Sequence, residues 1–167
     1  FSIQNSYGIL FDGAWLWEEY INILLSSHFY HPKNKSKFGA QKLFSDGKGL
    51  IYPDFISKSI APRLIVDAKY TPIENIRGRD YLHVLAYMYR FDASQGYYIY
   101  PDSEGQVPLV LNLNKGSTYE NNVSTRDDVN IIKLGFKIPN KSANYNDFKM
   151  QIHESELVLQ DFINSQI

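Results

Sequence analysis

The stretch from Ile51 to Tyr70 reads IYPDFISKSIAPRLIVDAKY. Two apolar runs with high β-propensity flank a polar, turn-rich break over residues 57–62. This pattern predicts two adjacent strands. Each predicted strand carries an acid near its end, Asp54 in the first strand and Asp67 in the second.

Asp67 interrupts an apolar strand and therefore needs a partner. A carboxylate taken out of water is tolerated only with a cation, with hydrogen bonds or with a shifted pKa. Side chains two apart on a strand share a face, so Asp67 and Lys69 project together while Ala68 points away. A neighbouring strand can bring Asp54 beside them, and two carboxylates next to an ammonium suit a hard divalent cation and hydrolytic chemistry. The alternative is a simple ion pair on an exposed edge strand, but the apolar run over residues 64–66 favours a central strand.

Further strands complete the expected sheet. A turn signal at Ser45–Gly49 joins a predicted strand over residues 38–44 to the strand of Asp54, which gives a meander of three strands. Pro53 has no N–H to donate, so we expect it where the hydrogen bonding of the sheet opens. Later strands are predicted over residues 97–100, 107–113 and 129–138.

Helices are predicted from apolar periodicity over residues 10–26, with Asp12 as a cap, and over residues 78–91 and 154–163. The second helix lies between the strand of Asp67 and the strand at residues 97–100. A strand–helix–strand unit of this length predicts that these two strands are parallel and that their connection is right-handed.

Composition sets the class of protein. The chain has 167 residues, 44% of them hydrophobic, which is sufficient for one domain over residues 1–167. The absence of cysteine excludes disulfides and thiolate metal sites. No run of about 18 apolar residues and no leader pattern occurs, so we expect a cytoplasmic protein without membrane contact. Because the chain begins with Phe1, we expect it to be a piece of a longer protein.

Charge is unevenly distributed along the chain. A net charge of −1 argues against a DNA partner, yet residues 28–79 contain ten Lys or Arg and four Asp or Glu, against seven and fourteen in the rest. The basic excess surrounds the proposed site. Lys48, Arg77 and Arg79 are candidate phosphate contacts, although scattered surface cations are an equally good reading of each.

A family resemblance adds to this picture. Pro53–Asp54, a gap of twelve residues and Asp67–Ala68–Lys69 resemble the motif of the PD-(D/E)XK nuclease superfamily. The segment LWEEYI at residues 16–21 resembles the helical glutamate motif of that superfamily, and residues 80–87 resemble its downstream helix. This combination is similar to the nuclease subunit of McrBC-type 5-methylcytosine restriction systems and to LlaJI-type restriction proteins. The resemblance covers roughly residues 8–100.

The resemblance implies a fold and a site. The implied fold class is α/β and restriction-endonuclease-like: a central mixed β-sheet flanked by helices, with an α-β-β-β-α-β core followed by C-terminal strands and a helix. The implied activity is Mg²⁺-dependent DNA cleavage, with Mn²⁺ as a substitute. Asp54, Asp67 and the Ala68 carbonyl would bind the metal, Glu18 would bind a metal or its water shell, and Lys69 would orient the attacking water and stabilise phosphoryl charge.

Three side-chain assignments remain open. Glu18 and Glu19 lie about 100° apart on a helix, and the family motif selects Glu18 as the inward one, whereas both could be solvated. His83 stands where many relatives carry a glutamine, so an accessory role and a packed helix histidine are both open. His28 and His31 have the spacing of a zinc pair, but no cysteine or further histidine nearby completes such a site, so we expect no metal there.

The resemblance also implies partners: double-stranded DNA and an AAA+ GTPase subunit that recognises modified DNA and translocates. A double-strand break needs two sites, so a dimer or a pair of complexes is expected. Two alternatives remain. The chain could be a non-catalytic nuclease-fold module that binds DNA or docks an AAA+ ring, or it could be a junction resolvase or repair nuclease.

Overall fold

The computed structural model describes residues 12–32, 39–105, 107–117 and 122–167. The elements follow in this order: α1 (Gly13–Leu25), β1 (Phe29–Tyr30), β2 (Gln41–Lys42), β3 (Leu50–Ile51), β4 (Phe55–Ser57), β5 (Leu64–Ala68), the 3₁₀ helix η2 (Ile73–Asn75), α2 (Arg79–Phe91), β6 (Gln95–Asp102), β7 (Leu109–Ser117), β8 (Asn122–Lys137) and α3 (Tyr145–Asn164).

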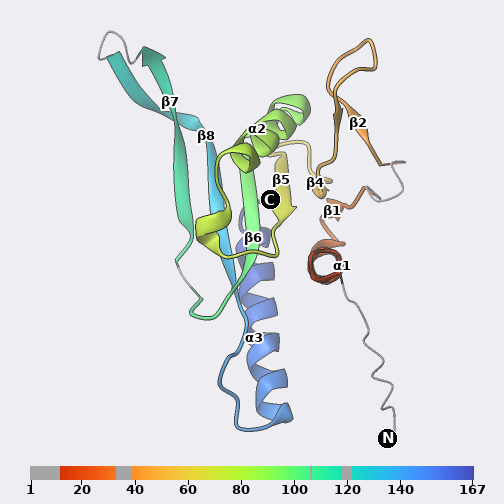
Figure 1. Cartoon of the computed structure of the whole chain (residues 1–167), viewed down its shortest axis with the longest axis vertical. Coiled ribbons are helices and arrows are strands. Elements are labelled where there is room, and N and C mark those ends of the chain that lie inside the picture. Colours follow the sequence, from red (N-terminus) through yellow and green to blue (C-terminus); the bar gives the residue numbers. More distant parts are fainter. Residues whose placement is uncertain (1–11, 33–38, 106, 118–121) are drawn as a thin grey trace, which may run out of the picture.

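The main sheet has six strands in the order β1-β4-β5-β6-β8-β7. β5 runs parallel to β6 and β6 parallel to β8, whereas the β1–β4, β4–β5 and β7–β8 pairs are antiparallel. The unit β5–α2–β6 therefore has the parallel strands that the sequence predicts. A mixed sheet flanked by helices confirms the α/β fold class (Figure 1).

Each face of the sheet has its own apolar core. On β5, Leu64 and Val66 pack with residues of α1 and α3, whereas Ile65 packs with residues of α2. Figure 1 shows α2 and α3 on opposite sides of the sheet. This alternation is the one expected for a strand covered on both faces, and it directs Asp67 and Lys69 to the α2 side.

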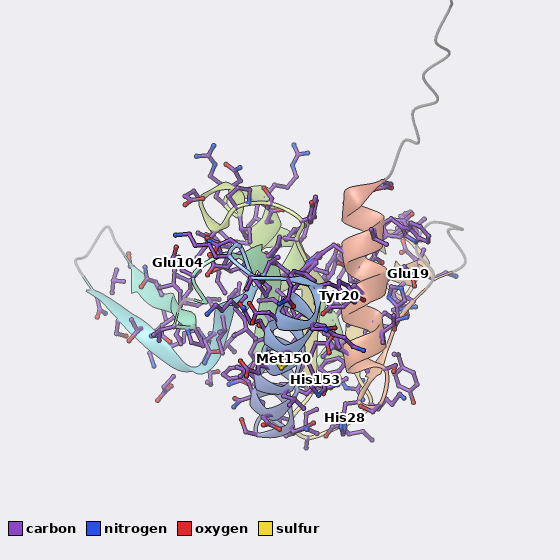
Figure 2. All side chains as sticks on the ribbon, turned by 90° about the horizontal axis from the view of Figure 1, so that it is seen from below. Glu19, Tyr20, His28, Glu104, Met150 and His153 are labelled. Carbon is purple, nitrogen blue, oxygen red and sulfur yellow. The ribbon has the colours of Figure 1, made fainter. Side chains whose placement is uncertain are left out.

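Helix α1 begins at a cap that the sequence predicts. The Asp12 side chain accepts a hydrogen bond from the Trp15 N–H at 3.0 Å. Trp17 and Ile21 lie on the buried stripe of the helix, while Trp15 is 44% exposed. Figure 2 shows Tyr20 on the side of α1 that faces α3, where its hydroxyl donates to Glu156 Oε1 at 2.8 Å. Helix α1 is thus fixed against both the sheet and α3.

The predicted three-stranded meander is wrong in one respect. β2 and β3 form a separate two-stranded sheet, and the strand expected around Asp54 is divided into β3 and β4. The division falls at Pro53, which cannot donate to a ladder. The short β1, which the sequence analysis did not predict, pairs with β4 in place of β2. Phe38, the expected start of the earlier strand, lies outside the described residues.

The C-terminal elements are longer than predicted. β8 begins at Asn122 instead of Val129, and with β7 it forms a hairpin that extends beyond the body of the sheet (Figure 1). Apart from Val123, its first residues are polar, and most of them are exposed, so they carry no apolar period that could reveal a strand. α3 begins at Tyr145, capped by Asn144, and buries Leu159 and Ile163. Leu157 is 45% exposed.

Across the described ranges, none of the helices is both long and apolar enough to span a bilayer.

Candidate active site

The β4–β5 hairpin brings Asp54 and Asp67 together. Phe55 pairs with Val66 in antiparallel register, and one step further along this register Asp54 lies opposite Asp67. Asp54 Oδ2 accepts a hydrogen bond from the Ala68 N–H at 2.9 Å. This bond fixes the Asp54 carboxyl group against the end of β5, beside Asp67.

The pKa of Asp54 is affected by the neighbouring acids. Burial raises the pKa of the Asp54 carboxyl group, and the charges of Asp67 and then Glu18 raise it further. The Ala68 N–H and the Lys69 ammonium act in the opposite direction, yet the pKa stays well above its usual range. The Asp54 carboxyl group, directly before β4, therefore lies within electrostatic reach of Asp67 on β5 and Glu18 on α1, and the Lys69 ammonium offsets their negative charge only in part.

Lys69 lies between two carboxylates. Its Nζ is 2.9 Å from Asp67 Oδ2 and 3.2 Å from Asp80 Oδ1. Burial alone would lower the pKa of the Lys69 ammonium, but the charge and hydrogen bonding of Asp67 and Asp80 raise it above its ordinary value. Lys69 is therefore held as a cation at the end of β5.

Glu18 approaches the site from α1. Its side chain is 20% exposed against 42% for Glu19, so the glutamate selected by the motif is the more buried of the two. His31 joins α1 to β4: Nδ1 lies 2.9 Å from the Asp54 carbonyl oxygen, and Nε2 lies 3.7 Å from Glu18 Oε1. The sequence analysis gave His31 no role, yet it contacts two of the predicted site residues.

Two tyrosines lie on the α2 side of the same site. Burial and the charges of Asp67 and Asp54 raise the pKa of Tyr87 to about 12, which places Tyr87 within electrostatic reach of both acids. The Tyr98 hydroxyl, beside Asp67 in the sheet register, is buried and has no hydrogen-bond partner among the described residues. Burial, followed by the charge of Asp67, raises the pKa of Tyr98.

The donor set fits a hard cation that keeps part of its water shell. Asp67 Oδ2 is buried and lies 2.9 Å from the Lys69 Nζ. Within the described ranges, no three His, Asp or Glu side chains come together closely enough to hold a metal ion by themselves. Two carboxylates with an adjacent backbone carbonyl are a small oxygen donor set, of the kind by which Mg²⁺ is bound together with waters. The residues present therefore fit Mg²⁺ better than a metal that needs a full protein cage.

One comparison with known proteins bears on this site. Residues 2–101, more than half of the chain, match the family model described as McrBC 5-methylcytosine restriction system component. The chain belongs to this McrBC family. No curated protein matches the chain.

The matched part of this McrBC component contains every residue of the acidic site. Strands β7 and β8 and helix α3 lie beyond residue 101. One side chain from that region reaches back: the buried Lys133 on β8 donates from Nζ to the carbonyl oxygens of Ile76 at 2.7 Å and Ile73 at 3.3 Å. Lys133 thereby attaches η2, which leads into the loop before Asp80, to the sheet.

The remaining predicted residues are exposed side chains outside the cluster of Asp54, Asp67 and Lys69. Arg77 and Arg79 are exposed where α2 begins, close in sequence to Asp80. Lys48 is exposed in the β2–β3 turn, where its Nζ lies 3.0 Å from Asp46 Oδ2. His83 is exposed on α2, and its ring stacks against Tyr87 with centroids 6.4 Å apart.

Asp80 and His31 are the contacts that sequence reasoning missed. An acid in the first turn of a helix is common because it complements the helix dipole, so Asp80 gave no separate signal for pairing with Lys69. The segment before β4 contains a two-residue strand that periodicity cannot detect, so the position of His31 was not predictable.

Proposed function

We propose that this McrBC component is a Mg²⁺-dependent DNA endonuclease of the PD-(D/E)XK type. The observation that carries the proposal is the meeting of Asp54, directly before β4, with the end of β5 that carries Asp67, where the Lys69 ammonium lies 2.9 Å from Asp67. The raised pKa of Asp54 shows that its ionised form is disfavoured beside Asp67. A bound metal cation would stabilise both carboxylates.

The carboxylates of Asp54 and Asp67, with the Ala68 carbonyl, would hold Mg²⁺, and Glu18 would bind the metal or its water shell. When bound, Mg²⁺ neutralises phosphoryl charge and makes a water nucleophilic near neutral pH. Asp54 is already oriented for this task, because Oδ2 is bonded to the Ala68 N–H. The ligands are therefore preorganised by the β4–β5 hairpin.

Lys69 would act as an electrostatic group in hydrolysis. The reaction forms a bond from the water oxygen to phosphorus and breaks the bond from phosphorus to one deoxyribose oxygen; the attacking water passes its proton to solvent water, and the leaving oxygen takes a proton from solvent to become a hydroxyl group. A lysine whose pKa is raised stays charged at neutral pH and cannot accept that proton. Its ammonium instead orients the attacking water and stabilises charge that develops on the phosphoryl oxygens.

Double-stranded DNA is the proposed substrate, and an AAA+ GTPase subunit is the proposed partner. Arg77 and Arg79 are exposed at the start of α2, three positions before Asp80 and directly before it, and can contact phosphates beside the site. Lys48 offers a further phosphate contact on the β2–β3 turn. Binding through these cations should weaken steeply as salt concentration rises.

The test is cleavage of methylated plasmid by the purified chain, alone and with the GTPase subunit, in Mg²⁺, Mn²⁺ or EDTA. We expect strand breaks in Mg²⁺ and Mn²⁺ and none in EDTA. Asp128→Asn, which removes an exposed carboxylate on β8 that pairs with Arg126, is a control that should cleave normally.

DNA binding without any strand break under every combination of metal, nucleotide and partner would contradict the proposal. It would favour a nuclease-fold module that has kept binding and lost catalysis. Cleavage of branched DNA in preference to methylated duplex would retain the chemistry and assign the chain to a junction resolvase or repair nuclease.

A further inference from the structure

His31 follows β1 directly and is held on two sides. Its Nδ1 lies 2.9 Å from the Asp54 carbonyl oxygen, and because a carbonyl oxygen only accepts, Nδ1 carries the hydrogen and donates. The ring stacks on Phe55 with centroids 4.8 Å apart and planes 24° apart. The orientation of the imidazole is therefore fixed from β4.

The hydrogen bond from His31 to Asp54 lies where the backbone pairing of β1 with β4 has ended. The β1–β4 ladder pairs Phe29 with Ser57 and Tyr30 with Ile56, and it ends there. The Asp54 carbonyl group lies beyond this end and is bonded by the His31 side chain. Because a backbone carbonyl group shielded from water needs a donor, His31 stabilises the turn that presents the Asp54 carboxyl group.

The opposite edge of the ring faces α1. Nε2 lies 3.7 Å from Glu18 Oε1 and 3.8 Å from Glu19 Oε1, and the His31 side chain is only 13% exposed. A single side chain therefore connects Asp54, directly before β4, to the helix that carries Glu18.

We propose that His31 is a positioning residue of the metal site. The Nδ1–H group holds the Asp54 turn in place, and the ring fills the space between that turn and Glu18 on α1. The inference rests on the proposed function, because it assigns His31 to the metal ligands of that site. Residues that orient metal ligands through hydrogen bonds commonly change metal affinity by about 10- to 100-fold when they are replaced.

The two ring nitrogens can be tested separately in the full chain. His31→Asn keeps an N–H donor near the position of Nδ1, His31→Gln places its amide near Nε2 instead, and His31→Ala removes both. His28→Ala is the matched control, because His28 is exposed at the C-terminal end of α1 (Figure 2). Mn²⁺ binding is measured without DNA by calorimetry and by electron paramagnetic resonance. These measurements report on the site independently of cleavage. The Tm of each variant in EDTA reports on folding.

We expect His31→Ala to bind Mn²⁺ about 10- to 100-fold more weakly than wild type, His31→Asn to recover most of that loss, and His28→Ala to match wild type. Equal Mn²⁺ affinity of wild type and His31→Ala would overturn the inference while leaving the proposed function intact. If His31→Ala fails to fold, equal affinities of His31→Asn and His31→Gln would overturn it. Absence of Mn²⁺ binding by wild type would contradict the proposed function itself, and the inference with it.

Discussion

Asp80 Oδ1 at the start of α2 lies 3.2 Å from Lys69 Nζ at the end of β5. The other oxygen, Oδ2, accepts a hydrogen bond from the Arg77 N–H at 3.2 Å. Asp80 therefore closes the first turn of α2 and holds the lysine at the same time. The position of the Lys69 ammonium depends on how α2 docks onto the sheet.

Asp80→Asn should lower the cleavage rate by roughly tenfold without loss of the fold, because the ammonium loses one of its two carboxylate partners and becomes less well oriented. The measurement is the single-turnover cleavage rate at saturating Mg²⁺. Asp92→Asn, at the other end of α2, is the control, because asparagine also accepts the left-handed conformation with φ 54° found there. A rate for Asp80→Asn equal to that of Asp92→Asn would refute a role for Asp80.

Asp54→Asn should raise the Tm of the metal-free protein at neutral pH. The pKa of Asp54 is raised in the folded state, so ionisation destabilises the fold once the pH exceeds the unfolded-state pKa of about 4. Below that pH the carboxyl group is protonated in both states, and the advantage of the variant should disappear. Thermal unfolding in EDTA across this pH range measures the difference in Tm between the variant and wild type. A lower Tm for Asp54→Asn at neutral pH would show that the ionised Asp54 does not destabilise the fold.

Lys133→Met should destabilise the fold by about 2 kcal/mol, because two carbonyl groups lose a charged donor within the protein. Cleavage should fall as well, since η2 leads to the loop before Asp80. Lys137→Met, an exposed position on the same strand, is the control for removal of a charge. Denaturant unfolding gives the free energies, and equal values for the two variants would show that Lys133 does not anchor η2.

Gly96→Ala should destabilise the fold by about 1–3 kcal/mol through overpacking. A Cβ atom at this position of β6 would lie 2.5 Å from Val84 Cγ1 and 2.6 Å from Met88 Sδ on α2. The double variant with Val84→Ala should recover part of the loss. Denaturant unfolding is again the measurement, and full stability of Gly96→Ala alone would contradict the close packing of α2 on β6.

Elements with strong local signals were predictable from the sequence. The apolar run of β5, the turn-rich break before it and the long stripe of α2 gave the parallel β5–β6 pair and the faces of Asp67 and Lys69. β1 was not predictable, because two residues carry no period. The long start of β8 was missed because its polar residues are stabilised by pairing with β7 and not by burial.

The candidate site divides in the same way. Asp54, Asp67 and Lys69 were predicted because a charged side chain at the end of a buried strand needs a charged or hydrogen-bonding partner. The contacts of Asp80 and His31 depend on how α2 and β1 dock against the hairpin. Such long-range geometry is set by tertiary packing, which no local pattern in this sequence encodes.

The most direct test of the central claim is Mg²⁺-dependent plasmid cleavage by Asp67→Ala and Lys69→Ala, each assayed with the GTPase subunit. We predict that both variants keep a wild-type circular dichroism spectrum and lose at least about 100-fold in cleavage rate. Asp67→Asn provides a more conservative replacement if Asp67→Ala is unstable. Undiminished cleavage by a folded variant at either position would contradict the claim that this site holds the metal and the scissile phosphate.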